Sequence, residues 1–204
     1  MAEITVITHA FNPGEYIYPC VDSVLNQTFQ DFKYVIVDNA SSDGSKEVLE
    51  EYAKKDSRIC LYRNEDNSAT LLDGMRRYVD TECFIILDHD DYLEKDALEL
   101  LYKLAVKENL DIVFGRCEMV GSKGEILETA GVRNDIACMT KDGLCKFFAP
   151  LYWQMRTVWG KLIKKDMVQH IDEETYLYRQ PSKYGGDTVI VLSMAFAAER
   201  LGTV

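Results

Sequence analysis

Phe84-Ile85-Ile86-Leu87-Asp88-His89-Asp90-Asp91 is the stretch that decides the fold of this chain. Its first four residues form the most apolar of the predicted strands, as expected for a strand buried on both faces of a parallel sheet. Three carboxylates follow at once. Open α/β sheets bind ligands beyond the carboxyl ends of their strands, so the change from apolar to acidic residues predicts a polar site there.

Predicted strands and helices alternate along the first half of the chain. Apolar runs predict further strands over residues 4–8, 34–37, 59–63 and 112–114. Apolar residues at helical spacing predict helices over residues 17–25, 45–55, 71–79 and 94–108, with Ser45 as the N-cap of the second. This order predicts an α/β fold with a mostly parallel central sheet flanked by helices.

The second half of the chain has a less regular pattern. We expect a hairpin and loop over residues 115–139, a helix over 141–148 and a loop over 180–186. Residues 157–163 mix aromatic, small and apolar side chains, and Asp187 opens a final apolar helix that reaches about residue 200. The sequence has no internal repeat and no linker, which favours one domain over residues 1–204, and a longer parent protein is compatible with it.

Composition and charge exclude several classes of protein. With 47% hydrophobic and 28% charged residues, the chain is typical of a globular domain. The net charge of -11 argues against unaided binding of nucleic acid or anionic lipid. No apolar stretch approaches the length of about 18 residues that a membrane span needs, and no signal peptide precedes the first strand. The six cysteines form no Cys-x-x-Cys pair, which favours buried free thiols in a reducing cytosol.

The acidic run after the most apolar strand is the sharpest chemical feature. Crowded carboxylates raise one another's pKa unless a cation compensates their charge. Mg²⁺ and Mn²⁺ prefer such oxygen ligands, and alternation along an extended segment directs Asp88 and Asp90 to one side, with His89 opposite. The alternative is a solvated acidic turn in which Asp91 caps the next helix.

Three further residues are candidates, each with a structural alternative. Asp38, with Asn39 beside it, ends a predicted strand and can accept hydrogen bonds from a ligand, or it can form an Asx turn. Phe11 follows the first strand and can stack on a planar ligand or belong to the core. Asp187 starts a helix whose dipole stabilises a carboxylate, or it is an ordinary N-cap.

Six segments, taken in order, resemble the family 2 inverting glycosyltransferases of GT-A fold across nearly the whole chain. Their order is far more specific than any one of them alone. They are Ile7-Thr8-His9-Ala10-Phe11-Asn12, Ser23-Val24-Leu25-Asn26-Gln27-Thr28, Val37-Asp38-Asn39-Ala40-Ser41-Ser42-Asp43-Gly44-Ser45, Leu87-Asp88-His89-Asp90-Asp91, Trp159-Gly160-Lys161-Leu162 and Gly186-Asp187-Thr188.

The resemblance implies a Rossmann-like nucleotide-sugar-binding half over residues 1–115 and an acceptor-binding half over residues 116–204. It also implies a role for each matching residue. The implied nucleotide pocket is lined by Thr8, His9, Ala10 and Phe11, with Phe11 against the base, and Asp38 holds the uracil. In the same resemblance Asp88 and His89 lie near the nucleotide, and Asp90 with Asp88 binds Mn²⁺ or Mg²⁺. The general base is Asp187, and the acceptor side carries Trp159 and Lys161.

The implied reaction moves a sugar, with inversion, from a nucleotide diphosphate donor, a UDP-sugar, to a hydroxyl of a saccharide or lipid-linked saccharide. Cell-envelope polysaccharide, lipopolysaccharide or capsule synthesis is the family-level expectation, in the cytoplasm or at the inner face of the membrane. One alternative is a nucleotidyltransferase that makes a sugar nucleotide, although no glycine-rich basic loop follows the first strand. A dinucleotide-dependent oxidoreductase is weaker, because no Gly-x-Gly-x-x-Gly follows any strand.

Three departures from the family pattern leave a non-catalytic nucleotide-sugar-binding domain as a further alternative. Asn39 stands where a second acid is usual, and Gly186 stands where a glutamate commonly precedes the general base. Residues 70–74 lack the arginine that many members carry before the fourth strand, and Arg76 or Arg77 could take its place.

Overall fold

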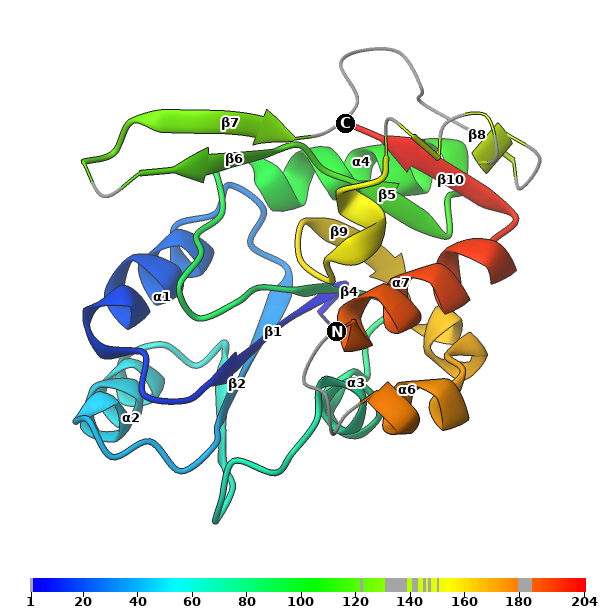
Figure 1. Ribbon diagram of the computed structural model, residues 1–204. Coiled ribbons are helices and arrows are strands. Elements are labelled where there is room, and N and C mark those ends of the chain that lie inside the picture. Colours follow the sequence, from blue (N-terminus) through cyan, green and yellow to red (C-terminus); the bar gives the residue numbers. More distant parts are fainter. Residues whose placement is uncertain are drawn as a thin grey trace. The chain divides into compact units, whose positions relative to one another are not determined.

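The computed structural model describes residues 2–121, 123–130, 139–140, 143–144, 146, 148–149, 151–179 and 185–204, with side chains for all of these except 177–179. Two units divide the chain, Met1–Glu99 and Leu100–Val204 (Figure 1). The boundary falls within helix α4, which covers Ala97–Glu108.

The first unit alternates strands with helices, as the sequence predicts. Its elements are β1 (Ile4–Ala10), a 3-10 turn η1 (Gly14–Tyr16), α1 (Ile17–Leu25), β2 (Phe32–Asp38), α2 (Ser45–Lys55), β3 (Ile59–Arg63), α3 (Leu71–Tyr78) and β4 (Cys83–Ile86). The strands lie in the order β3-β2-β1-β4, and each neighbouring pair is parallel. In this register Ile4 lies opposite both Phe32 and Cys83.

Burial of the central strands explains their apolar sequences. Val6, Val35 and Ile85 have no exposed surface, because helices cover both faces of the sheet. Right-handed crossovers from β1 to β2 and from β2 to β3 place α1 and α2 on one face. The return from β3 to β4 runs the other way across the sheet and places α3 on the opposite face (Figure 1).

Two helix starts in the first unit follow from local chemistry. The Thr70 side chain accepts a hydrogen bond from the Asp73 backbone N–H, and the Asp73 side chain bonds back to the Thr70 N–H, which forms a capping box. The prediction of Ser45 as an N-cap was wrong by one residue. Gly44 takes that position with a φ of 95°, a left-handed conformation that glycine adopts without strain.

The second unit is built on a mixed sheet and a separate hairpin. Its elements are β5 (Ile112–Phe114), β6 (Cys117–Val120), β7 (Ile126–Ala130), β8 (Met139–Thr140), η2 (Gln154–Arg156), β9 (Lys161–Lys164), η3 (Lys165–His170), α6 (Glu173–Arg179), α7 (Gly186–Ala197) and β10 (Arg200–Thr203). The order is β9-β5-β10-β8, where β5 and β10 are parallel and the other two pairs are antiparallel. The antiparallel strands β6 and β7 form the hairpin.

In the second half of the chain, the predicted hairpin and strand are present, whereas the final helix ends earlier than predicted. The hairpin is confirmed over Cys117–Val120 and Ile126–Ala130, and the strand over Ile112–Phe114 is confirmed. The final helix was predicted to reach about residue 200, which was wrong: α7 ends at Ala197, and Arg200–Thr203 form β10 because they pair with β5. Residues 131–138 and 180–184, and much of the predicted helix over 141–148, lie outside the described residues.

The α/β fold class with a mostly parallel sheet is confirmed. Of the described cysteines, Cys20 and Cys83 are buried free thiols as predicted, whereas Cys60 and Cys117 are half-buried. In the described part of the chain, no helix has both the length and the apolar character that crossing a bilayer requires.

Candidate functional site

The parallel strands of the first unit end at one edge of their sheet, and the predicted nucleotide-side residues gather there. Ala10 lies opposite Asp38 in the register of β1 and β2, and the Ala10 carbonyl accepts from the Asn39 backbone N–H at 2.8 Å. His89 reaches the same edge, since its Nδ1 lies 3.1 Å from the His9 carbonyl oxygen. The structure therefore brings together segments that the sequence separates by up to 80 residues.

Asp88, Asp90 and Asp91 form a compact carboxylate cluster just beyond β4. One carboxylate oxygen from each residue lies within 4.8 Å of those from the other two. Desolvation raises the pKa of Asp91, the charge of Asp90 raises it further, and His89 opposes both. An all-oxygen set of this size suits a hard divalent cation, which would also relieve the repulsion. The alternative in which Asp91 caps the next helix is wrong, because α4 begins at Ala97.

A buried chain of polar groups fixes the backbone of this cluster. The Cys20 thiol donates to the Asp88 carbonyl at 3.5 Å and lies 3.6 Å from the Tyr34 hydroxyl, which lies 3.1 Å from Thr8 Oγ1. Burial raises the pKa of Cys20 to about 11, so the thiol keeps its proton and can donate. Thr8 thus lies beneath the edge of the sheet, where it supports the cluster through Tyr34 and Cys20.

The segment Ser23–Thr28 holds the chain that leaves the cluster. The Gln27 amide donates to the Glu94 carbonyl at 2.7 Å, and its side-chain oxygen accepts from the Leu98 backbone N–H at 3.0 Å. A buried glutamine is well suited to this task, because its amide both donates and accepts. Gln27 therefore holds in place the segment from Glu94 to Leu98, which follows the acidic turn in the chain.

Asp38 is held by Arg63, a residue that belongs to none of the six family-like segments. The carboxylate is 2% exposed, and it accepts from Arg63 Nη1 at 2.7 Å and from the Ser41 backbone N–H at 2.9 Å. Asn39, the departure from the usual second acid, accepts from the Asn64 side-chain amide at 2.7 Å. The end of β3 therefore supplies the partners for the end of β2, a pairing that only their adjacency in the sheet creates.

His9 lies partly buried at this edge, against helix α3. Burial lowers the pKa of His9 to about 4, although the charge of Asp73 works in the opposite direction. Its Nε2 is buried and has no hydrogen-bond partner among the described residues. The imidazole is therefore neutral at physiological pH, with one ring nitrogen unused.

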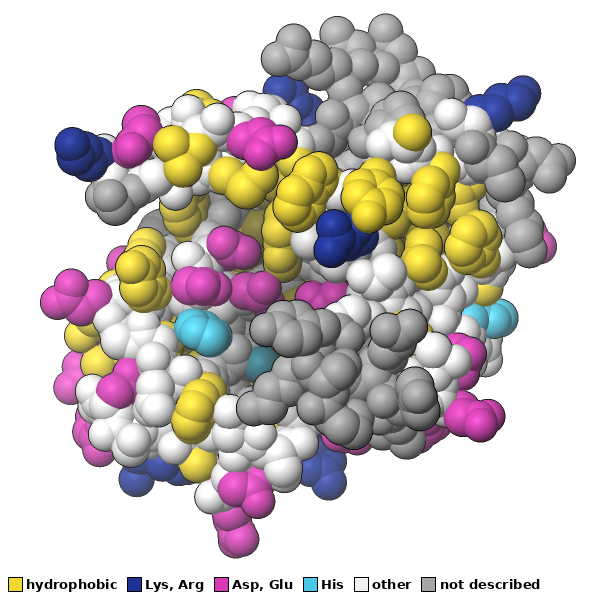
Figure 2. Space-filling view, viewed as in Figure 1, with side chains coloured by type: hydrophobic (Ala, Val, Ile, Leu, Met, Phe, Trp, Pro, Cys, Tyr) yellow, Lys and Arg dark blue, Asp and Glu magenta, His cyan; other side chains and the backbone are white. Residues whose placement is uncertain are grey.

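An open cleft of about 780 Å³ lies over the edge, within the size range of small-molecule sites. Phe11, which precedes the lining residue Asn12 in the chain, is 42% exposed, so it is not a core residue. On the face drawn in Figure 2, carboxylate side chains gather next to histidines. The cleft is lined by Asn12, Pro13, Gly14, Glu15, Tyr16, His89 and Asp90.

Hydrogen bonds between two loops shape the rim of the cleft. Asn12, at a φ of 49°, donates its backbone N–H to Ser41 Oγ, and its side-chain oxygen accepts from the Ser42 N–H at 2.8 Å. Asp43 accepts from the Gly14 N–H at 2.8 Å. The loop after β1 is therefore tied to the loop after β2. Only the place of Asn12 in the first family-like segment pointed to this residue.

In the second unit, Asp187 is the second residue of α7 and is half-buried. Gly185 occupies the N-cap position, so the alternative that Asp187 caps this helix is wrong. Burial raises the pKa of Asp187, and the charge of Lys161 lowers it. A carboxylate with a raised pKa is a stronger base than a solvated one.

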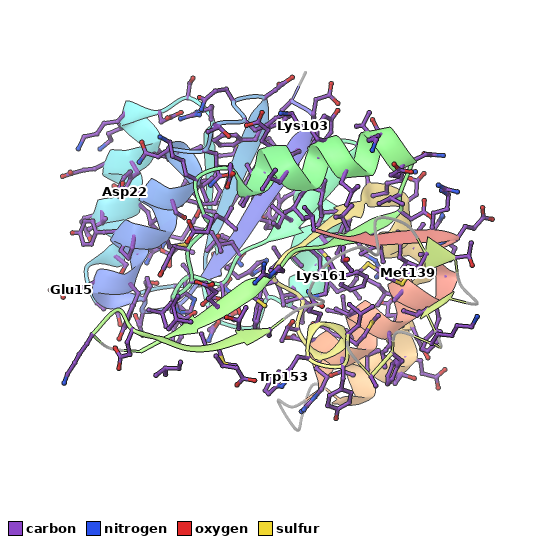
Figure 3. All side chains as sticks on the ribbon, turned by 90° about the horizontal axis from the view of Figure 1, so that it is seen from above. Glu15, Asp22, Lys103, Met139, Trp153 and Lys161 are labelled. Atoms are coloured by element: carbon purple, nitrogen blue, oxygen red, sulfur yellow. The ribbon has the colours of Figure 1, made fainter. Side chains whose placement is uncertain are left out.

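The two predicted acceptor-side residues differ in accessibility. Trp159 is half-buried, whereas Lys161 is 1% exposed, and its Nζ donates to the Trp159 carbonyl at 2.9 Å. Figure 3 labels Lys161 among the side chains of the second unit, while Trp153 lies at the edge of that unit. The ammonium of Lys161 is therefore enclosed by protein in this structure.

Known structures define the class of this protein. S. aureus TarS in complex with UDP-GlcNAc matches with a TM-score of 0.76 at 18% identity, over 100% of this chain and 56% of that one. A mannosyltransferase from Pyrobaculum calidifontis, in complex with GDP-Man and Mn²⁺, matches with a TM-score of 0.63 at 15% identity, over 99% and 54%. The protein is thus of the GT-A class of glycosyltransferase folds.

Sequence comparison gives the family. The model of glycosyl transferase family 2 matches residues 5–180, and the chain belongs to that family. The glycosyltransferase GlyA of Streptococcus pneumoniae is 34% identical over 116 residues, which are 55% of this chain and 16% of the relative. A poly(ribitol-phosphate) β-N-acetylglucosaminyltransferase, TarP of Staphylococcus aureus, is 28% identical over 141 residues, or 67% and 43%. The chain spans less than half the length of either relative.

Proposed function

We propose that this chain transfers a sugar from a UDP-sugar to an acceptor hydroxyl, with inversion and with the help of a divalent cation. The observation that carries the proposal is the carboxylate cluster beyond β4, with its three ligand atoms within 4.8 Å of one another at the edge of the cleft. The family and the UDP-GlcNAc bound to a structural neighbour support this donor class. Residues 1–115 would bind the donor and residues 116–204 the acceptor.

The cleft itself argues for a cation. Glu15 and Asp90 both line it, and a diphosphate entering between two carboxylates would meet repulsion. Asp90, with Asp88, would hold Mn²⁺ or Mg²⁺, and the oxygen ligands present fit either ion. When bound, the ion would compensate the charge of the donor diphosphate as a Lewis acid. The Mn²⁺ bound to the neighbouring mannosyltransferase supports the proposal.

The nucleotide would lie along the edge of the sheet. The exposed ring of Phe11 is available to stack on the base, and His89 lines the cleft. Asp38 would accept the uracil imide N–H, because each carboxylate oxygen keeps a second lone pair besides those that meet Arg63 and Ser41. Thr8, His9 and Ala10 would form the wall behind it, with Thr8 and Ala10 fully buried.

Asp187 is proposed as the general base. Its carboxylate would take the proton of the acceptor hydroxyl as that oxygen forms a bond to the anomeric carbon. The bond from the anomeric carbon to the diphosphate oxygen breaks in the same step, and its electron pair leaves with UDP. A single displacement of this kind inverts the anomeric configuration.

The acceptor is proposed to be a saccharide or lipid-linked saccharide of the cell envelope, with Trp159 on its side of the site. The relatives support this at the level of class, since one of them acts on poly(ribitol-phosphate). The reaction would take place in the cytoplasm or at the inner face of the membrane, where such donors and acceptors meet.

A product assay tests the proposal. The full chain is incubated with a panel of UDP-sugars and Mn²⁺, with and without saccharide acceptors, and released UDP is measured together with the anomeric configuration of the product. We expect Asp90→Asn and Asp187→Asn to abolish transfer, while Asp66→Asn retains it, because Asp66 lies in an exposed loop and bonds to Ser68. Release of pyrophosphate in place of UDP, or full activity of Asp187→Asn, would contradict the proposal.

A further inference from the structure

A short segment of the second unit presents three large side chains to solvent. Tyr152 and Trp153 are 48% and 49% exposed, and Arg156 of η2 is exposed beside them. Figure 3 labels Trp153 at the outer edge of this unit. Single exposed apolar residues are ordinary, but two aromatic side chains and a cation gathered in one place indicate a binding surface.

The backbone of this segment is fixed by its inward-facing residues. Leu151 and Met155 are buried, and the Met155 backbone N–H donates to the Leu151 carbonyl at 2.9 Å. The buried Gln154 donates from its side-chain amide to the Gly115 carbonyl. Because the segment is already ordered in the free protein, a ligand on its outer side would bind without the entropic cost of ordering it.

The guanidinium of Arg156 is held by aromatic rings and not by an acid. Its Cζ lies 5.4 Å from the centre of the Tyr152 ring and 5.7 Å from that of Trp153, within the range of cation–π attraction. Among the described residues, no carboxylate pairs with it. In a chain with a net charge of -11, an exposed guanidinium without an acidic partner is available to an anion from outside.

A small cavity of about 120 Å³ opens beside these side chains. Tyr152 and Arg156 line it on one side, and Thr188 and Leu192 of α7 line it on the other. Phe148 also lines it, with its ring centre 6.3 Å from that of Tyr152. Apolar walls with a few polar groups are typical of sites for small molecules.

This combination of groups fits a saccharide that carries a negative charge. The C–H face of a sugar ring packs on an aromatic ring, because the aromatic face is negatively polarised. A guanidinium binds a carboxylate or a phosphate through two parallel N–H groups. The Thr188 hydroxyl can donate to or accept from a sugar hydroxyl. Since Thr188 follows Asp187 in the chain, a ligand in the cavity would lie against the helical turn that carries the proposed base.

We propose that the cavity between η2 and α7, with the exposed side chains of Tyr152, Trp153 and Arg156, is an acceptor subsite for an anionic saccharide. The rings pack on the sugar, and the guanidinium binds its carboxylate or phosphate. The assignment as an acceptor subsite rests on the proposed function. A lipid surface fits less well, because the site is hollowed and because anionic lipid repels so acidic a chain.

Binding is measured on the full chain without donor, from the NMR signal of the Trp153 indole N–H. The chain has two tryptophans, so Trp153→Phe assigns the signal. The probes are methyl glucoside, methyl glucoside 6-phosphate, methyl glucuronide and inorganic phosphate. We expect at least one charged glycoside to bind about tenfold more tightly than methyl glucoside, the low end for a hydrogen bond to a charged group. The stronger of the two identifies the anion. Equal binding of charged and neutral glycosides, or binding of none, would overturn the proposal.

Variants locate the effect. Arg156→Gln, which should fold because Arg156 is exposed, should remove the preference for charge and leave the affinity for methyl glucoside unchanged. Arg156→Lys should keep part of the preference, since the charge remains and the planar fork is lost. Tyr152→Ala should weaken the binding of every glycoside. Lys165→Gln is the matched control, because it removes the same charge from an exposed position of η3 in the same unit. If it lowers the preference as much as Arg156→Gln, net charge is the cause and the proposal is wrong.

Sedimentation with vesicles of phosphatidylcholine and phosphatidylglycerol tests the lipid alternative. We expect no binding to these vesicles, and binding that Arg156→Gln abolishes would overturn the proposal in favour of a membrane surface.

Release of UDP from UDP-sugars with Mn²⁺ separates this proposal from the proposed function. If no UDP-sugar is turned over while charged glycosides bind through Arg156, the proposed function fails and the saccharide site stands. If transfer to neutral and charged glycosides is equally fast in the wild type and in Arg156→Gln, the proposed function stands and the subsite is excluded.

Discussion

Gly74 of α3 lies directly against His9 of β1, so that a Cβ on Gly74 would stand 2.1 Å from the imidazole Nε2. A contact under 3.0 Å forces a shift, and Ile7 of the same strand lies at 3.3 Å from the same point. The absence of a side chain at residue 74 thus lets α3 approach the edge of the sheet that bears the candidate site. This explains a glycine in the middle of a short helix, where it is otherwise unfavourable.

We expect Gly74→Ala to destabilise the protein. Higher helix propensity should contribute about 1 kcal/mol in favour of alanine, whereas overpacking of a tight contact costs about 1–3 kcal/mol, so the net effect is a loss. Urea unfolding measures the change in the free energy of unfolding. A double-mutant cycle with His9→Ala tests whether the contact with His9 causes it. With the imidazole removed, Gly74→Ala should become neutral or stabilising, and equal effects in both backgrounds would exclude the contact as the cause.

His9 should make the protein sensitive to acid. The pKa of His9 is about 4 in the folded state, against the ordinary value of 6.5. Between about pH 4 and pH 6.5 the unfolded chain therefore binds a proton at this residue and the folded chain does not. Stability contributed by the neutral ring is complete above about pH 6.5 and falls as the pH falls toward 4. A pKa lowered from 6.5 to about 4 corresponds to roughly 3 kcal/mol of stability.

The measurement is the free energy of unfolding of the wild type and of His9→Gln across this range. The difference between the two should change with pH, because only the wild type carries the titrating ring. His170→Gln, an exposed histidine of η3, is the control and should parallel the wild type. A constant difference between wild type and His9→Gln would show that the burial of His9 does not oppose protonation.

Asp90→Asn should separate metal binding from stability. The charge of Asp90 raises the pKa of Asp91, which reports repulsion within the cluster. Removal of one charge should stabilise the metal-free protein slightly, by about 0.5 kcal/mol. It should also abolish most of the rise in Tm that Mn²⁺ produces in the wild type. Thermal unfolding at increasing Mn²⁺ concentrations tests both expectations. If Mn²⁺ raises the Tm of Asp90→Asn as much as that of the wild type, Asp90 is not a ligand of the metal.

Arg63→Ala should loosen the loop after β2. Its guanidinium bonds to Asp38 and to the Ser41 carbonyl, so alanine leaves a carboxylate that is 2% exposed with one partner fewer. Loss of a hydrogen bond to a charged group costs about 1.5–3 kcal/mol, and half of that is reasonable here because the arginine side chain is 39% exposed. Weaker UDP binding should accompany the loss of stability.

Calorimetry of UDP binding with Mn²⁺ and urea unfolding give the two readouts. Arg63→Lys should restore only part of either, because one ammonium replaces two guanidinium nitrogens that meet different acceptors. Arg77→Ala is the matched control, since Arg77 is exposed and its guanidinium lies over the Tyr78 ring. Equal behaviour of the two alanine variants would remove Arg63 from the site.

Local pattern was sufficient for most elements of the first unit. Apolar runs predicted the positions of β1 to β4 along the chain, and β1, β2 and β4 are buried on both faces, so no alternation obscures them. It was insufficient for β10, whose residues Arg200–Thr203 become a strand by pairing with β5. The identity of a strand that depends on a partner far along the chain is not contained in its own composition.

The same distinction holds for the candidate site. Asp88, Asp90 and Asp91 were visible because they are adjacent in sequence and follow a buried strand. Arg63 was not, since its role arises from the adjacency of β2 and β3, and Cys20 was not, since it reaches Asp88 across 68 residues.

The sequence by itself determined the alternation of strands and helices, the acidic turn at the end of β4 and the family. These are short-range features, encoded in hydrophobic period and in residues that stand side by side. Tertiary structure alone decided which groups meet: Arg63 with Asp38, Gly74 with His9, and Lys161 with the Phe114 ring. Burial and charge at a site depend on contacts between distant segments, and only the packed sheet brings those segments together.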